Sequence, residues 1–473
     1  MHLILLSGGS GKRLWPLSND SRSKQFLKLL PSDKKLNRPI SMLQRTWQQL
    51  QNTNLTGSTV VSTSKSQIDM IHNQIGTSVP LVIEPSKRDT YPAIALSSLY
   101  LYSVKSVPED EIVVVMPVDS YVEDEFFQHV KNLGEILQGS NADLALIGIN
   151  PTFPSEKYGY IVPSDFNKPE QNKNVQTVRC FKEKPTYGQA KQLISEGALW
   201  NSGVFAFKLD YILKSLKERG IALNYAELLQ TYSHLPARSF DYEIVENTKN
   251  IVVVSYNGAW KDLGTWNTLT EEMGASIIGK GIMSSDCNNV HIINELDIPV
   301  SVLGLSDLIV AVSPDGILVS DKKESPRVKE IADQFDNRPM YEERRWGWYR
   351  VLDFTKYSDT KEVLTKRIGV TAGKNLSYQK HYHRSEVWTI IKGKGLFVLN
   401  GKILKIQEGD VLQIPAGALH GIKAITDLEF IEVQAGSELI EEDIVRIFME
   451  WEDIEAHCKN TKMIRKKIGD LND

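Results

Sequence analysis

The chain has 473 residues, of which 41% are hydrophobic and 24% are charged, and its formal net charge is −4. This length predicts two or three domains, and the charge balance argues against nucleic-acid or membrane-surface binding. No apolar run approaches the roughly 20 residues of a membrane helix, and the first residues lack the pattern of a signal peptide. The three cysteines are widely spaced and form no metal-type pair. We therefore expect a cytoplasmic protein.

Short apolar runs alternate with helical patterns over the first half of the chain. The runs that predict strands are Leu3–Leu6, Ser58–Val61, Leu81–Ile83, Ile112–Pro117 and Leu144–Ile149, followed later by Gly159–Pro163, Thr177–Lys182, Gly203–Lys208 and Ile251–Ser255. Helical patterns such as Met42–Leu50 and Ala93–Tyr102 lie between them. This alternation predicts an α/β domain with a mostly parallel sheet and helices on both faces.

The pattern changes near Ile277. Residues 281–320 carry short β-type segments separated by Asn, Asp, Ser and Gly, which predicts a small all-β segment. A charged helix is expected over Ser325–Phe335, and Asp336–Arg345 is polar enough to be a linker. From Trp346 to about Gln434 the chain is again β-rich. Hairpins are predicted at Lys392–Lys394 and Asn400–Gly401, and a helix from Glu438 onward.

A glycine-rich loop follows the first predicted strand. Leu3–Leu6 leads directly into Ser7, Gly8, Gly9, Ser10, Gly11, Lys12 and Arg13. Glycines let backbone N–H groups approach phosphate oxygens, and the basic side chains, with Lys24 further on, supply the complementary charge. The loop is not a Walker A motif, because no Gly-Lys-Ser/Thr closes it, and the spacing of its glycines does not fit the dinucleotide fingerprint. A glycine-rich turn without chemical consequence is the alternative.

Residues GGSGKRLWPLS and KQFLKL closely resemble the signature of the sugar nucleotidyltransferases that make GDP-mannose. Nearly the whole chain is similar to the long, two-part mannose-1-phosphate guanylyltransferases whose C-terminal part resembles a mannose-6-phosphate isomerase. The resemblance implies a Rossmann-like nucleotidyltransferase domain over residues 1–276 and a short left-handed β-helix-like segment with a helix over 277–335. A linker over 336–345 and a cupin β-barrel with a C-terminal helix over 346–473 would follow.

The same resemblance assigns the nucleotide site. Residues 84–90 read EPSKRDT, which resembles the segment near the purine ring and ribose. The implied nucleotide contacts are Leu6, Gly8, Gly9, Gly11, Lys12, Arg13, Glu84, Arg88 and Thr90, with Arg13 and Lys24 also expected to act in catalysis. Residue types alone leave the base open among guanine, adenine, cytosine and thymine.

Two aspartates are the candidate Mg²⁺ ligands and complete the expected catalytic set. Asp119 follows the strongest apolar run, VVVMPVDS, and strand ends at the crevice of an α/β sheet are where ligands bind. A carboxylate there suits Mg²⁺, and a helix N-cap is the alternative. Asp262 lies in AWKDLGTWNTL, which resembles the second metal-binding position of the family; by spacing alone it reads as a turn residue or cap.

Three further segments resemble the sugar-phosphate site of the family. FKEKP supplies Glu183 for sugar hydroxyls and Lys184 for the phosphate, WNSG supplies Asn201, and YGYI supplies Gly159. Taken alone, a Glu-Lys-Pro tripeptide is usually a solvated turn.

The C-terminal part matches the two cupin metal motifs. Gln379, His381 and Glu386 occur as Q-x-H-x4-E, and residues 409–420 read GDVLQIPAGALH, which ends in His420. Four ligands of this type suit Zn²⁺, Mn²⁺ or Co²⁺. His383 competes with His381, and buried histidines without metal are the alternative. Arg446, in a segment similar to the isomerases, is implied to meet the sugar phosphate or the enediol.

The leading hypothesis is that GTP and α-mannose 1-phosphate react to give GDP-mannose and pyrophosphate. A bifunctional version would also interconvert fructose 6-phosphate and mannose 6-phosphate through the cupin. The alternatives are a nucleotidyltransferase for another sugar 1-phosphate, such as a heptose, and a cupin that serves as a silent sensor or dimerisation domain. No nucleic-acid or membrane partner is expected. The protein is expected to form a homodimer.

Overall fold

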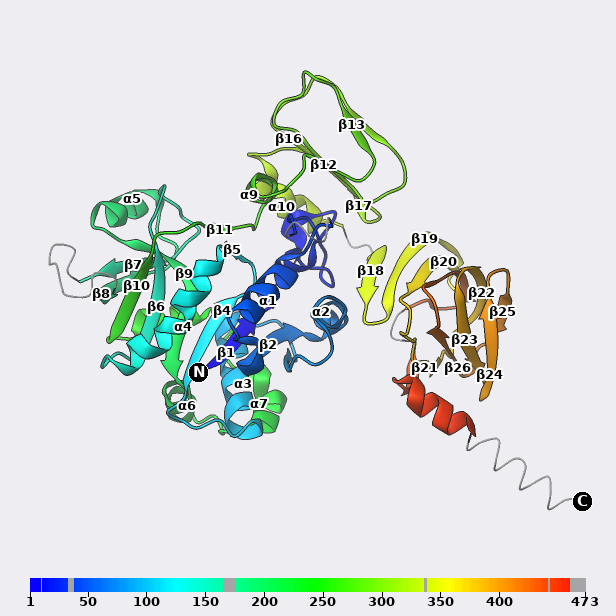
Figure 1. Ribbon diagram of the computed structural model, residues 1–473, viewed down its shortest axis with the longest axis horizontal. Coiled ribbons are helices and arrows are strands. Elements are labelled where there is room, and N and C mark those ends of the chain that lie inside the picture. The colour runs from blue at the N-terminus through cyan, green and yellow to red at the C-terminus, as the bar shows by residue number, and fades with distance from the viewer. Residues whose placement is uncertain (10, 33–37, 165–174, 336–337, 441–442, 460–473) are drawn as a thin grey trace, which may run out of the picture. The chain divides into compact units, whose positions relative to one another are not determined.

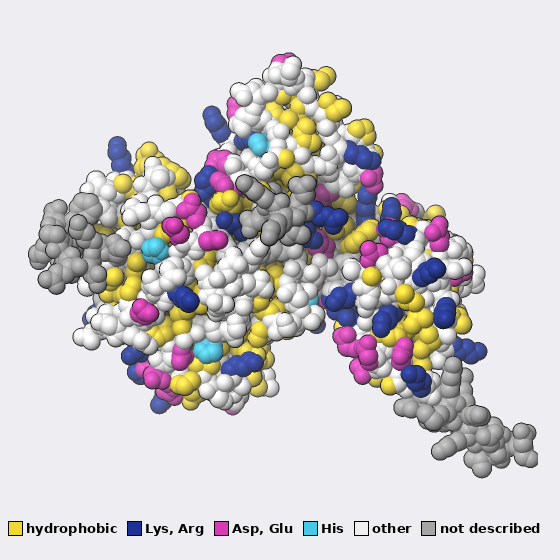
Figure 2. Space-filling model, viewed as in Figure 1, with side chains coloured by type: hydrophobic (Ala, Val, Ile, Leu, Met, Phe, Trp, Pro, Cys, Tyr) yellow, Lys and Arg dark blue, Asp and Glu magenta, His cyan; other side chains and the backbone are white. Residues whose placement is uncertain are grey.

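The computed structural model describes residues 1–9, 11–32, 38–164, 175–335, 338–440 and 443–459 (Figure 1). Its contacts divide the chain into two compact units, Met1–Ala311 with Leu318–Phe335, and Val312–Ile317 with Asp336–Asp473. On the face seen in Figure 2, basic and acidic side chains are interspersed over each unit, in keeping with the small net charge. No helix of the described residues is long and apolar enough to cross a membrane.

The first unit is built on one mixed sheet whose strand order is β3-β2-β1-β4-β9-β6-β10-β8-β7. The strands are β1 (His2–Leu6), β2 (Thr59–Ser64), β3 (Leu81–Glu84), β4 (Ile112–Pro117), β6 (Leu144–Ile149), β7 (Tyr160–Pro163), β8 (Val175–Lys182), β9 (Leu199–Lys208) and β10 (Ile251–Tyr256). β8 and β9 run opposite to the others. The predicted α/β sheet is therefore confirmed, with two reversed strands that the sequence pattern did not indicate.

Helices cover both faces of this sheet (Figure 1). α1 (Met42–Asn52), α2 (Ile68–Ile75) and α4 (Asp124–Gln138) pack with Leu3, Leu5 and Val114 into one core. α3 (Thr90–Leu99), α6 (Leu209–Glu218) and α7 (Tyr225–Thr231) pack with Ile4 and Val113 into the other. Successive strand residues point to opposite faces, so the continuous apolar runs serve two cores at once. Shorter helices are α5 (Tyr187–Ser195), α8 (Phe240–Glu243) and α9 (Trp266–Glu271).

The β segment after residue 276 consists of short strands in two small sheets, in the orders β12-β14-β16-β17 and β13-β15. They are β12 (Ile277–Ile278), β13 (Gly281–Met283), β14 (His291–Asn294), β15 (Val300–Val302), β16 (Leu308–Ser313) and β17 (Gly316–Asp321). β12 pairs with β14 and β13 with β15, each in parallel, as successive coils of a β-helix do. The helix predicted over Ser325–Phe335 is shorter than expected: a 3₁₀ turn (Ser325–Arg327) precedes α10 (Val328–Ala332).

The C-terminal barrel combines a six-stranded and a five-stranded sheet, in the orders β18-β19-β20-β27-β22-β25 and β24-β23-β26-β21-β28. Their bounds are β18 (Tyr341–Arg344), β19 (Gly347–Ser358), β20 (Lys361–Val370), β21 (Tyr378–Lys380), β22 (Arg384–Lys392), β23 (Lys394–Leu399), β24 (Lys402–Gln407), β25 (Val411–Ile414), β26 (His420–Ala424), β27 (Leu428–Gly436) and β28 (Val445–Phe448). The barrel core contains Trp388, Phe397 and Phe430.

Three predictions for this part are wrong in detail. Tyr341–Arg344, placed in the linker, form β18 and pair with β19. The hairpin at Lys392–Lys394 is a corner, because β22 and β23 belong to different sheets. The tail predicted as helix from Glu438 first forms β28, paired with β21, and the described chain is helical over 451–459. The Asn400–Gly401 hairpin is confirmed, with positive φ at both residues as a two-residue turn requires.

Candidate active site and metal centre

The glycine-rich loop starts where β1 ends at Leu6. Gly9 has φ 151°, and a side chain on Gly11 would place its Cβ 2.4 Å from the carbonyl oxygen of Asn19. Gly11 therefore has to be glycine, since backbone atoms cannot give way. Gln25 donates to the Ser7 carbonyl at 2.8 Å, which ties the loop to the following segment. The described residues of the loop are therefore held on both sides, at Ser7 and at Gly11.

The basic residues of the loop lie in different surroundings. Arg13 is exposed, whereas the Lys12 ammonium is 3.3 Å from the carboxylate of Asp333, just after α10. The Lys24 ammonium lies between two carboxylates, 2.7 Å from Asp119 Oδ2 and 3.1 Å from Asp262 Oδ1. The structure thus brings together three of the four predicted catalytic residues.

A short antiparallel ladder explains how the two aspartates meet. β5 (Ser120–Val122) follows Asp119 directly and pairs with β11 (Trp260–Asp262), in a register that sets Asp262 opposite Ser120. Neither aspartate caps a helix: the residue capping α4 is Glu123, and the one capping α9 is Thr265. The cap alternatives from the sequence are therefore wrong.

Charge pairing sets the protonation of this cluster. Burial would lower the pKa of Lys24, but the carboxylates of Asp119 and Asp262 raise it above its ordinary value. Burial would likewise raise the pKa of Asp119, yet the Lys24 ammonium holds it below its usual range. The two carboxylates are thus a charged oxygen pair that already accommodates one cation, which is the donor chemistry that Mg²⁺ requires.

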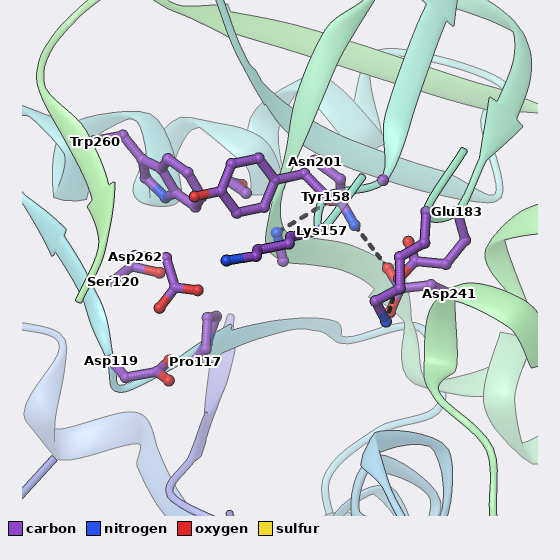
Figure 3. A pocket seen from close by; sticks show the side chains of 14 residues that line it. Pro117, Asp119, Ser120, Lys157, Tyr158, Glu183, Asn201, Asp241, Trp260 and Asp262 are labelled. Carbon is purple, nitrogen blue, oxygen red and sulfur yellow. Dashed lines mark hydrogen bonds and ion pairs between the residues drawn. The ribbon is translucent and has the colours of Figure 1, made fainter. Parts of the chain in front are cut away.

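A cavity of about 200 Å³ opens beside these carboxylates (Figure 3). It is lined by Pro117, Asp119, Ser120, Lys157, Tyr158, Gly159, Glu183, Lys184, Asn201, Ser202, Gly203, Asp241, Trp260 and Asp262. All four residues predicted for the sugar phosphate are therefore in one cavity with both predicted Mg²⁺ ligands. Their elements come from distant parts of the chain.

Each sugar-side residue is held in a defined position. A Cβ on Gly159 would lie 2.5 Å from Glu183 Oε2, so glycine here lets that carboxylate reach the cavity. Asn201 accepts from Gly203 N at 3.0 Å and donates to Asp241 Oδ1 at 2.6 Å. Lys184 has φ 43° and its ammonium is 2.9 Å from Glu183 Oε1. Strained backbone of this kind persists where surrounding structure imposes it, and it clusters at functional sites.

Sequence reasoning missed Asp241, Lys157 and Trp260 as lining residues. Trp260 could have been found, because it is part of the segment that carries Asp262. Lys157 directly precedes the YGYI match and could have been read from its position. Asp241 has no local signal, since nothing around it distinguishes it from an ordinary acidic residue of a short helix.

Asp241→Asn should remove a pH dependence of stability. Burial, aided by the nearby Glu183, raises the pKa of Asp241 from 3.8 to about 7. The folded chain therefore holds this proton more tightly than the unfolded chain, and the resulting stability is complete below about pH 4 and lost as the pH rises through 7. Urea unfolding at pH 4 and pH 8 should show wild type losing roughly 1–3 kcal/mol more than Asp241→Asn. Asp20→Asn, which changes an exposed carboxylate, is the control; equal pH losses in wild type and Asp241→Asn would contradict the assignment.

The remaining nucleotide candidates lie outside the cavity. Glu84 is buried, accepts from the Tyr232 hydroxyl at 2.8 Å, and would be 3.3 Å from a Cβ on Gly8, so it adjoins the glycine-rich loop. Arg88 donates to the carbonyl of Leu235, and Thr90 accepts from Phe240 N. In this structure Arg88 and Thr90 thus tie the segment over residues 84–90 to Leu235 and Phe240.

The barrel brings three predicted metal ligands together. One ligand atom from each of His381, Glu386 and His420 lies within 4.8 Å of the others, and all three residues are buried. The Nε2 atoms of both imidazoles are 3.4 Å from the Glu386 carboxylate. Gln379, the fourth predicted ligand, has its amide nitrogen 3.2 Å from His381 Nε2. His383 is exposed, which agrees with the choice of His381.

Hydrogen bonds on the far side of each ring fix the tautomer. His420 Nδ1 donates to the Ala418 carbonyl at 3.0 Å, and His381 Nδ1 donates to the carbonyl of Asp443. Both Nε2 atoms then carry a lone pair on the side of the carboxylate. That of His381 accepts from the Gln379 amide and from Arg384, whereas His420 Nε2 is buried without a hydrogen-bond partner among the described residues. The His420 lone pair and the Glu386 carboxylate repel each other unless a cation lies between them, so the donor set fits a divalent metal.

Glu386 is also tied to the protein by charge. Arg384 Nε donates to its Oε1 at 3.0 Å, and Trp388 Nε1 donates to its Oε2 at 3.1 Å. Arg446 is exposed on β28 and pairs in register with Gln379, which in turn pairs with His420. Direct cross-strand partners point to one face, so Arg446 is on the ligand side.

Comparisons with known proteins match both parts of the chain. Residues 2–276 match the Nucleotidyl transferase family, and residues 335–449 match the family described as Mannose-6-phosphate isomerase C-terminal. The chain is 30% identical to the Escherichia coli K12 Mannose-1-phosphate guanylyltransferase, covering 94% of this chain and 97% of that protein. It is also 30% identical to the Xanthan biosynthesis protein XanB of Xanthomonas campestris, with the same coverage.

A solved structure supports the fold of the first unit. A Thermus thermophilus protein described as a mannose-1-phosphate geranyltransferase superposes with a TM-score of 0.58 and 26% identity, covering 71% of this chain and 99% of that one. The relatives span nearly the whole chain, and the family match covers more than half of it. The chain therefore belongs to the nucleotidyl transferase family, among the two-part members that end in a mannose-6-phosphate isomerase C-terminal domain.

Proposed function

We propose that this enzyme transfers a guanylyl group from GTP to mannose 1-phosphate, giving GDP-mannose and pyrophosphate. The observation that carries the proposal is the single cavity in which Asp119 and Asp262 face Gly159, Glu183 and Asn201. A metal-binding carboxylate pair beside a hydroxyl-binding pocket is what joining a nucleotide to a sugar phosphate requires. The relatives named for the same reaction support the choice of substrates.

The chemistry follows from the roles of the chain's own groups. A phosphate oxygen of mannose 1-phosphate attacks the α-phosphorus of GTP, and the bond from that phosphorus to the β-bridging oxygen breaks as pyrophosphate leaves with the electron pair. Glu183, Asn201 and Gly159 orient the sugar, so that attack occurs within one bound complex. Mg²⁺ held by Asp119 and Asp262 would supply charge neutralisation at the phosphates. Lys24 and Arg13 add fixed positive charge.

Substrate identity is tested by pyrophosphate release. Purified enzyme is offered each nucleoside triphosphate in turn with several hexose and heptose 1-phosphates. GTP with mannose 1-phosphate should give the highest kcat/KM. Preference for a heptose 1-phosphate, or for another base, would favour the alternative nucleotidyltransferase.

Lys184→Ala should weaken use of mannose 1-phosphate far more than use of GTP. Lys184 lines the sugar side of the cavity, and losing one charge-assisted phosphate contact costs roughly 1.5–3 kcal/mol, which is about 10- to 100-fold in kcat/KM. Steady-state kinetics with each substrate varied in turn measure the effect. Lys182→Ala, which removes an exposed lysine two positions away, is the control. Unchanged kinetics for mannose 1-phosphate would make Lys184 a solvated surface residue.

For the barrel we propose a second, metal-dependent activity, the interconversion of fructose 6-phosphate and mannose 6-phosphate. It is favoured by the unpartnered Nε2 of His420 beside Glu386 and His381. Zn²⁺, Mn²⁺ or Co²⁺ would be held by these residues with Gln379, and proton transfer between C1 and C2 would proceed by general acid–base chemistry. Isomerase turnover with each metal added tests it. Metal binding without turnover would favour a silent sensor or dimerisation domain.

We also propose a homodimer and a cytoplasmic location. Light scattering on the purified chain tests the first, and fractionation of the source cells tests the second. A monomer across the micromolar range would contradict the dimer.

A further inference from the structure

Two lysines, Lys157 and Lys184, line the cavity of the first unit, and a third, Lys24, contacts two of its carboxylates. Lys24 and Lys184 are already paired. Lys24 lies between Asp119 and Asp262, and Lys184 is bound to Glu183. Within the described part of the chain, no ion pair holds the ammonium of Lys157, which is exposed. Figure 3 shows Lys157 extending into the cavity below the ring of Tyr158, with its ammonium directed toward Asp262. Lys157 is thus a cation directed at the proposed metal site, and no role has yet been assigned to it.

The backbone that carries Lys157 is fixed on both sides. The Tyr160 hydroxyl accepts from Ser155 N at 2.9 Å and donates to the Ser155 carbonyl at 3.1 Å. Ser155 Oγ accepts from Lys157 N at 3.2 Å. On the other side the Tyr158 ring packs edge-on against Trp200 and Trp260, with centroids 5.0 and 5.4 Å apart. The side chain therefore projects from a positioned turn, which limits the entropy lost when it binds a ligand.

The negative charge of the cavity would be partly offset by the Lys157 ammonium. Its four carboxylates, Asp119, Glu183, Asp241 and Asp262, outnumber the two ammoniums paired with them, those of Lys24 and Lys184, so a phosphate dianion entering beside them meets repulsion. A divalent metal on Asp119 and Asp262 offsets part of this charge. An ammonium between those carboxylates and the sugar side offsets it where the attacking phosphate has to lie. Lysine acts as a point charge toward phosphate.

We propose that Lys157 binds the phosphate of the sugar 1-phosphate on its reacting side and holds it for attack on the nucleotide. This assignment rests on the proposed function. Lys157 and Lys184 then contact the same phosphate from two parts of the chain, Lys184 next to the hydroxyl-binding Glu183 and Lys157 next to the metal-binding carboxylates. Because Lys157 touches the reacting group, its loss affects kcat as well as KM.

The experiment compares Lys157→Gln, which keeps length without charge, with Lys157→Arg, which keeps the charge. Lys191→Gln on α5 is the matched control, since Lys191 is exposed and outside the cavity. KM and kcat are measured for mannose 1-phosphate and for GTP, and for GDP-mannose and pyrophosphate in the reverse direction. Calorimetric titration of mannose 1-phosphate into each variant measures binding without turnover.

Lys157→Gln should lower kcat/KM for mannose 1-phosphate about tenfold or more and weaken its binding, with KM for GTP unchanged. Lys157→Arg should recover most of the loss, and the wild-type advantage should shrink as salt is raised. Wild-type values in Lys157→Gln would overturn the assignment, as would a loss confined to GTP or pyrophosphate. If the wild type makes no GDP-mannose but binds mannose 1-phosphate in a Lys157-dependent way, the proposed reaction fails and the phosphate contact stands.

Discussion

Asp119→Ala and Asp262→Ala should each abolish nucleotidyl transfer and leave the chain folded. Asp119 lies just before β5 and Asp262 ends β11, and their side chains are 33% and 36% exposed rather than packed in a core. Losing either removes half of the carboxylate pair, and metal-supported charge neutralisation contributes several kcal/mol to such a step. A loss of at least about 1,000-fold in kcat is expected, corresponding to roughly 4 kcal/mol.

Several measurements separate a lost metal site from a lost fold. Circular dichroism and thermal unfolding report the fold, and electron paramagnetic resonance with Mn²⁺ reports metal binding without turnover. Asp210→Ala on α6 is the control, because that half-buried carboxylate lies outside the cavity and forms an ion pair with Lys214 in the next turn. Near wild-type activity at saturating Mg²⁺ in either variant would remove that residue from the metal site. Retained Mn²⁺ binding with lost activity would assign the residue to phosphate positioning instead.

The parallel part of the sheet was predictable because buried strands need apolar residues on both faces. Ile112–Pro117 and Leu144–Ile149 are such runs, and both coincide with strands. The reversal of β9 was not predictable, since its residues are equally apolar whichever way the strand runs. The corner at Gly393 was unpredictable for a similar reason. A Lys-Gly-Lys sequence predicts a hairpin whether the next strand pairs within the same sheet or joins the other sheet.

Some residues of the candidate site were likewise predictable from the sequence, and others were not. Gly11 and Gly159 could be selected from motifs, because close backbone or side-chain approach at these positions tolerates no Cβ. The meeting of Asp119 with Asp262 depends on the three-residue pairing of β5 with β11, which is too short to leave a pattern. Asp241 reaches the cavity through its hydrogen bond with Asn201, a long-range contact that no local sequence feature records.

His420→Ala should strip the barrel of its metal, abolish isomerase turnover and leave guanylyl transfer intact. His420 supplies one of three buried ligand atoms, and even disturbing a residue behind a ligand weakens metal binding by about 10- to 100-fold, so deleting a ligand should exceed that. Glu386 is a poorer choice for the test. Its removal would leave Arg384 buried without its counter-charge, which costs about 3–5 kcal/mol and would confuse metal loss with unfolding.

His383→Ala is the matched control, since it deletes an exposed imidazole close to the ligands in sequence. Bound metal per chain, isomerase turnover and pyrophosphate release are measured on the same preparations. Full metal content in His420→Ala would contradict the ligand set. Metal in the wild type without isomerase turnover would make the sensor hypothesis the better one. Loss of guanylyl transfer in folded His420→Ala would mean that the two sites are coupled, because nothing within the first unit's own cavity depends on that imidazole.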